Sequence, residues 1–156
     1  MLEYETIDQL ISIQLSRIGD IDLEIESALR AYDDFQVNKP FDTRIIPDSR
    51  RDQGSTVYSF RSTHNCAVSR CLPSLFVSIY SPDVNIDLTA ARKQELNSVQ
   101  AELELSRLAA YPVDQNNYLV ITREIAIGCS IDQNTLLRSI EDLISEYSTL
   151  VLPRFL

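Results

Sequence analysis

Glycine and basic residues are scarce in this chain, and each shortage excludes a class of function. Glycine occurs only at positions 19, 54 and 128, which leaves no glycine-rich loop able to cradle a phosphate group. Lysine and arginine total 14 against 23 aspartate and glutamate residues, giving a formal net charge of -9 and an isoelectric point near 4.5. Such a surface repels phosphate backbones, so nucleic acid is not expected as a partner.

Long apolar stretches are also missing. No run approaches the roughly 18 uninterrupted apolar residues of a membrane span. The opening "MLEYETIDQL" carries acidic residues where a secretion signal needs apolar ones. We therefore expect no membrane insertion and a cytoplasmic location. The three cysteines are an odd number in a chain long enough to fold by burial alone, which favours reduced thiols over a disulfide framework.

The composition that remains is typical of a globular protein. The chain has 156 residues, of which 44% are hydrophobic and 24% charged, enough to bury a substantial core. We predict a single domain over residues 1–156. It divides into a helical N-terminal region at 5–35, a loop at 38–55 and an α+β body at 56–156.

The N-terminal region has the apolar spacing of a helix. Apolar residues recur at steps of three and four from Ile7 to Tyr32, which places them on one helix face. Residues 19–26 also alternate between apolar and acidic, as a half-buried strand would. Because the helical phase continues across Gly19, we favour two helices or one interrupted helix, with Asp20 capping the second part.

The body begins with strand-like runs and then turns helical. Three short runs rich in β-branched and aromatic residues, at 56–62, 66–72 and 74–80, predict an antiparallel meander. From Leu88 to Leu108 the apolar spacing is helical. Thr89 is a suitable N-cap, and Pro112 is expected to stop this helix.

The C-terminal part predicts one more strand and one more helix. Residues 116–128 alternate as a strand, and Ser130 and Gln133 are spaced as a capping box. The apolar face of the helix that follows comprises Leu136, Leu137, Ile140, Leu143, Ile144, Tyr147 and Val151. The predicted fold class is therefore α+β, with a twisted antiparallel sheet packed by N-terminal, middle and C-terminal helices.

The stretch "THNCAVSRC" at 63–71 holds the chain's single histidine and two of its cysteines. His64, Cys66 and Cys71 could supply three zinc ligands, and Cys129 a fourth if the fold brings it near. Alternation along an extended segment places His64 and Cys66 on one face and sends Cys71 to the other. Cys129 also lies just before a predicted helix, where a thiolate is favoured, and His64 could serve as its base. Core packing is the simpler interpretation for all three cysteines.

An aromatic face of the sheet is the other candidate site. If the alternate side chains of residues 116–128 face the helices, Tyr118 and Val120 face away from them. We expect these two to be joined by residues from neighbouring strands, giving a protein-binding or dimerising patch of Tyr58, Phe60, Phe76, Tyr80, Tyr118 and Val120. The alternative is that these side chains form the second side of a two-sided core.

The C-terminal half resembles a known family of binding proteins. The segment "RKQELNSVQAELELSRL" and the segment "VDQNNYLVITREIAIGCSIDQNTLLRSIEDLISEYSTLVLPRF" look like the YbjN and type III secretion chaperone-like proteins over about residues 88–156. The shared pattern is a helix, a strand ending in "REI", a polar turn and an amphipathic terminal helix. This resemblance implies an α+β fold with helices on one side of an antiparallel sheet, frequent dimerisation and binding of a protein segment. It implies no catalytic residues.

These observations predict a non-enzymatic chaperone-like or regulatory adaptor that binds a partner polypeptide and that could form a homodimer. No residue pattern indicates a cofactor. Two alternatives stay open: a metal- or redox-binding protein using His64, Cys66, Cys71 and Cys129, and an assembly factor or structural subunit of a larger complex.

Overall fold

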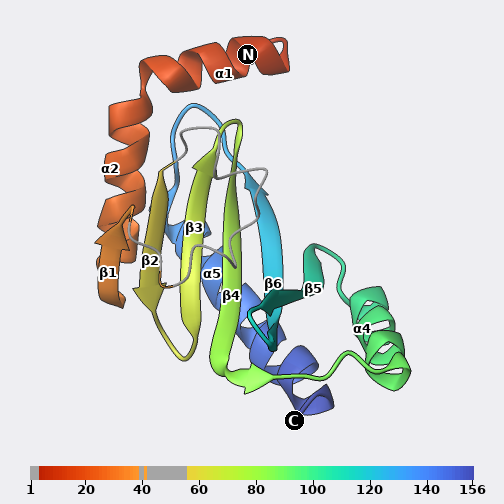
Figure 1. Ribbon diagram of the computed structural model, residues 1–156. Helices are drawn as coiled ribbons and strands as arrows, with labels where there is room; N and C mark the ends of the chain where they lie inside the picture. The colour runs from red at the N-terminus through yellow and green to blue at the C-terminus, as the bar shows by residue number, and fades with distance from the viewer. Residues whose placement is uncertain (1–3, 39–40, 42–55) are drawn as a thin grey trace.

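The computed structural model describes residues 4–38, 41 and 56–156, and these form an α+β fold around one open antiparallel sheet (Figure 1). The sheet has six strands in the order β1-β2-β3-β4-β6-β5. Their bounds are β1 Asp33–Val37, β2 Val57–Arg61, β3 Asn65–Cys71, β4 Ser74–Asn85, β5 Ser106–Val113 and β6 Asn116–Ala126. Within the described residues, no helix is both long and apolar enough to cross a lipid bilayer.

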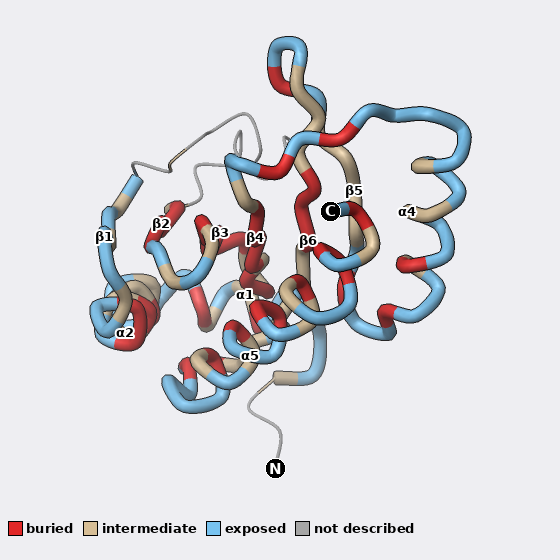
Figure 2. Tube along the Cα trace, turned by 90° about the horizontal axis from the view of Figure 1, so that it is seen from below, coloured by how far each residue is buried: buried red, intermediate tan, exposed pale blue. Residues whose placement is uncertain are grey.

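The helices are distributed unequally around this sheet (Figures 1 and 2). Helices α2 (Ile18–Leu29) and α5 (Gln133–Glu146) cover one face, and α1 (Ile7–Ser16) lies across the end that carries the β3–β4 turn. Helix α4 (Ala90–Glu102) instead flanks the outer edge of β5. The predicted packing of the sheet by N-terminal, middle and C-terminal helices is thus confirmed, with the middle helix at an edge.

The main core lies between the sheet and the helices that cover it. The β2–β3 and β3–β4 registers place Phe60 opposite Cys66 and Cys66 opposite Ile79, so these side chains share the helix-covered face. All three are fully buried, as are Ile21 and Ile25 of α2. The apolar stripe of α2 therefore packs against the helix-covered face of the sheet, as its spacing predicts.

The helical interpretation of the N-terminal region is confirmed, with two corrections. The helices separate at Arg17, and Gly19 lies within the first turn of α2. Asp20 is not the cap, because the N-cap position is Arg17, whose side chain makes no capping bond. The capping box belongs to α1, where Thr6 and Gln9 bond each other's backbone N–H groups.

The strand meander at 56–80 is confirmed, and it is longer than its sequence signal. Strand β4 continues past Pro82 to Asn85, with a register shift between Tyr80 and Asn85. Strand β1 was not predicted, since its acidic start follows directly on the helical stripe. Of the predicted loop at 38–55, all but Asn38 and Phe41 lies outside the described residues.

The predicted helix at 88–108 is too long. Thr89 caps α4 as expected, and the helix ends at Glu102 because the apolar stripe at helical spacing stops at Leu103. Beyond it, Ser106–Val113 form strand β5 and pair with β6. Pro112 therefore ends no helix. It lies in β5 at the edge of the sheet, where its missing N–H leaves no ladder bond unmade.

The C-terminal helix is confirmed together with its buried face. Its N-cap is Asp132 and not Ser130, since the Asp132 carboxylate accepts from the N–H groups of Asn134 and Thr135. A π-helical turn at Tyr147–Val151 follows α5. There the buried Tyr147 hydroxyl donates to the Leu119 carbonyl oxygen at 2.8 Å and accepts from the Ser81 N–H at 3.2 Å, which ties this turn to β4 and β6.

Candidate functional site

A groove of about 1010 Å³ runs along β5, at the edge of the sheet beside the C-terminal end of α4. One wall comes from α4 and the turn after it, and the floor comes from β4, β5 and β6. The lining residues are Phe76, Gln100, Glu104, Leu105, Ser106, Arg107, Leu108, Ala109, Tyr111, Thr122 and Glu124. The groove thus combines aromatic and aliphatic surface with charged side chains.

The backbone of β5 faces this groove. Gln100 of α4 donates from Nε2 to the Ser106 carbonyl oxygen at 2.9 Å and accepts at Oε1 from the Leu108 N–H at 2.7 Å. Backbone groups alternate in direction along an antiparallel strand. The Ser106 carbonyl and the Leu108 N–H point toward α4. The N–H and C=O of Ala110, two residues further along the strand, therefore also point away from β6. Within the described residues β5 is an outermost strand, so Ala110 has no strand beside it.

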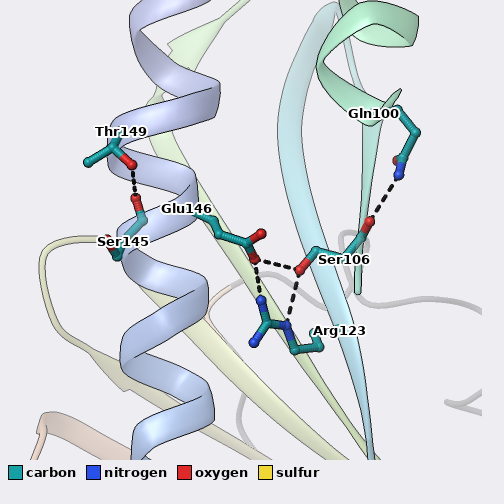
Figure 3. Close-up of polar contacts among 6 residues, drawn as sticks. All are labelled: Gln100, Ser106, Arg123, Ser145, Glu146 and Thr149. Atoms are coloured by element: carbon teal, nitrogen blue, oxygen red, sulfur yellow. Dashed lines mark hydrogen bonds and ion pairs between the residues drawn. The ribbon is translucent and has the colours of Figure 1, made fainter. Parts of the chain in front are cut away.

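A polar network fixes β5 from its inner side (Figure 3). Arg123 of β6 forms an ion pair with Glu146 of α5, and the two side chains are only 11% and 21% exposed. The Ser106 hydroxyl accepts from Arg123 Nε at 3.1 Å and donates to Glu146 Oε1 at 2.7 Å. Four elements, α4, α5, β5 and β6, are therefore joined through Ser106, and the start of the edge strand has a defined position.

The groove is lined by more acidic than basic residues. Glu104 and Glu124 contribute two carboxylates, and Ser74 donates to Glu124 from its hydroxyl at 2.8 Å. Arg107 is the basic residue of the lining. Together with the chain's net charge of -9, this excess of carboxylates favours an occupant that carries positive charge.

The predicted aromatic patch is divided between the two faces of the sheet. Tyr58 and Phe60 lie on the helix-covered face, where both are fully buried, so the prediction that they join the other face was wrong. Adjacent apolar residues in "VYSF" give no clear alternation, and their facing is determined by pairing with Val68 and Cys66.

The other four predicted residues share the opposite face. Val120 lies opposite Tyr80 in the β4–β6 register, and the two are buried in a second small cluster with Val113, against which Tyr118 packs. Tyr80, Val120 and Tyr118 thus belong to a second core on this face of the sheet, which agrees with the alternative prediction of a two-sided core. Phe76 is half-buried and lines the groove, so one member of the predicted patch belongs to the candidate site.

His64 and Cys66 are neighbours at the start of β3, where the Cys66 thiol donates to the His64 carbonyl oxygen at 3.4 Å. The His64 Nε2 lies 3.0 Å from the Ser148 hydroxyl, and its ring meets Tyr147 edge-on. Burial lowers the pKa of His64 and raises the pKa of the Cys66 thiol to about 12, which keeps that thiol protonated. Cys71 faces away from Cys66, as alternation predicts. In the part of the chain that the structure describes, no group of His, Cys, Asp and Glu is arranged to hold a metal ion.

Comparison with known proteins gives a match in fold. No family model matches this chain, and no curated protein gives a significant match. The crystal structure of YbjN from E. coli, described as a proposed transcription regulator, matches with a TM-score of 0.50 at 9% sequence identity. The match covers 62% of this chain and 74% of the YbjN chain. The chain is similar in fold to YbjN. At this identity the likeness concerns the fold alone, and it confirms that part of the predicted resemblance.

In this YbjN-like fold, the sequence prediction missed most of the groove. The apolar spacing predicts that Gln100 and Arg107 lie in one helix, so it places neither residue beside an exposed strand edge. A usable signal was present in Pro112, which within a strand marks an edge of the sheet.

Proposed function

We propose that this protein is a non-enzymatic binding module, a chaperone-like or regulatory adaptor, that holds an extended segment of a partner polypeptide in the groove beside β5. The observation that carries the proposal is the outward-facing backbone of Ala110, whose chain neighbours Ala109 and Tyr111 line the groove. An added strand gains affinity from such main-chain groups and specificity from pockets for its alternate side chains. Glu104 and Glu124 favour a segment with basic residues.

The positions of the reactive side chains agree with a binding role. His64 contacts Ser148 and Tyr147 in a structural setting, and the raised pKa of Cys66 disfavours a nucleophilic thiolate. Arg123 and Glu146 are engaged with each other and with Ser106. The fold shared with YbjN, itself described as a proposed regulator, is compatible with a regulatory adaptor.

The experiment that tests this proposal removes one backbone donor. Ala110→Pro deletes the outward N–H at a position where an edge strand tolerates proline. The probe is a fluorescent synthetic peptide of alternating valine and threonine with a lysine at each end, whose binding is followed by anisotropy. We expect about a tenfold loss of affinity, the equivalent of one main-chain hydrogen bond. Ala110→Ser keeps the N–H and serves as the matched control.

Two results would contradict the proposal. If the peptide binds the Ala110→Pro variant as well as the unaltered protein, the outward backbone of β5 takes no part in binding. If the peptide binds neither of them, the β5 edge is not a binding site for extended segments.

A further inference from the structure

The side chain of Gln100 makes hydrogen bonds to β5 that the backbone of a neighbouring strand would otherwise make. It bonds the Ser106 carbonyl oxygen and the Leu108 N–H, which lie one residue to either side of Arg107. A residue of a parallel strand placed opposite Arg107 would donate to the first of these groups and accept from the second. Gln100 therefore satisfies both groups on the outer side of β5 without any strand being present.

The backbone that presents Gln100 is firmly held. Val99 and Leu103 of α4 are buried in the main core. On the adjoining face of this helix, Arg154 pairs with Glu95 at 2.5 Å and also with Glu102. Because α4 is fixed at both places, the Gln100 amide stays next to β5.

The groups that Gln100 bonds are fixed as well. Ser106 is 2% exposed, and its hydroxyl is held by Arg123 and Glu146. Rotation of the Gln100 side chain therefore frees the Ser106 carbonyl and the Leu108 N–H, with no movement of β5 itself. The contact is local and reversible.

We propose that the Gln100 side chain is an autoinhibitory contact that competes with the partner segment for the edge of β5. This inference rests on the proposed function, since it supposes that an extended, basic segment binds there. Gln100 lowers the affinity of every such segment, because each must replace two existing hydrogen bonds before making its own. It also protects the start of β5 from unspecific strand pairing while the groove is empty.

The test compares Gln100→Ala with the unaltered protein, using the lysine-flanked valine and threonine peptide as the probe. Loss of the competing amide should tighten binding on the order of tenfold, the equivalent of about one net hydrogen bond. Gln94→Ala is the matched control. Gln94 is an exposed glutamine of the same helix that does not line the groove, so its variant should bind as the unaltered protein does.

A second measurement needs no substitution. In the NMR spectrum of the unaltered protein, saturation with the peptide should move the side-chain amide resonances of Gln100 to the positions of a solvated glutamine. Equal affinity of the Gln100→Ala variant and the unaltered protein, weaker binding by the variant, or unmoved Gln100 resonances in the saturated complex would each overturn the autoinhibitory role. The proposed function would survive these three results. Absence of peptide binding to both proteins would overturn the proposed function and, with it, the inference.

Discussion

Replacing Glu146 by leucine while Arg123 remains should cost about 3 kcal/mol of unfolding free energy, the lower end of the range for breaking a buried ion pair. The Arg123 side chain is 11% exposed, so water cannot replace the lost carboxylate. The Ser106 hydroxyl loses its acceptor at the same time. Arg123→Met should cost less, about 2 kcal/mol, because Glu146 is more exposed and keeps the Ser106 donor.

The double variant Arg123→Met with Glu146→Leu separates the pair from its surroundings. Because no charge is left buried alone, it should cost only about 2 kcal/mol, which implies a coupling of about 3 kcal/mol between the two side chains. Urea unfolding followed by far-UV circular dichroism suits a chain without tryptophan. Asp142→Leu, at an exposed position of α5, should change stability by less than about 0.5 kcal/mol. If the two single costs simply add in the double variant, the ion pair does not join α5 to the sheet.

Two further predictions concern His64, which is half-buried, and Gln14, which is fully buried. Burial lowers the pKa of His64 below its ordinary 6.5, so the unfolded chain takes up its proton first as the pH falls. Stability should therefore decline below about pH 6.5, and His64→Gln should remove that part of the decline in urea titrations between pH 7 and 5; an unchanged pH profile would contradict it. Gln14 is fully buried and donates to the carbonyl oxygens of Ile127 at 3.1 Å and Gly128 at 2.8 Å. Gln14→Leu should cost about 2 kcal/mol and release α1 to faster amide exchange, whereas unaltered exchange in α1 would show that Leu10 alone holds this helix.

The elements that sequence reasoning predicted best have a strong period over many residues. Over α5 and the π-helical turn that follows it, seven apolar side chains fall on one face, and in β6 the residues Leu119, Ile121 and Ile125 share one face of the strand. Burial against a sheet rewards both patterns, so local signal and tertiary structure agree. The four residues preceding Gln133 contain several capping candidates, and only the structure shows that Asp132 makes the bonds.

The boundary between α4 and β5 could not be predicted in the same way. Leu96, Val99 and Leu103 keep the helical spacing, and counting Leu108 with them predicts a helix that continues to that residue. Pairing with β6, a contact distant along the chain, decides that Ser106–Val113 form a strand. A helix propensity is readily overridden by such a pairing.

The candidate site depends on the same long-range contact. Gln100 is an ordinary helix residue until β5 lies beside it, and no local pattern marks its side chain as a substitute for a strand. The sheet face of Tyr58 and Phe60 likewise depends on the β2–β3 register. The sequence therefore predicts the fold class and a binding role, while the location of the groove requires the tertiary structure.

Amide hydrogen exchange of Ala110, measured with and without the lysine-flanked peptide, tests directly whether a partner segment adds as a strand to the edge of β5. The account predicts that the Ala110 N–H, which faces away from β6, exchanges rapidly in the free protein and becomes protected when the peptide adds as a strand. If the peptide slows the exchange of amides elsewhere on the sheet but leaves the exchange rate of the Ala110 amide unchanged, strand addition at β5 is contradicted. The peptide would then bind at a place other than the edge of β5.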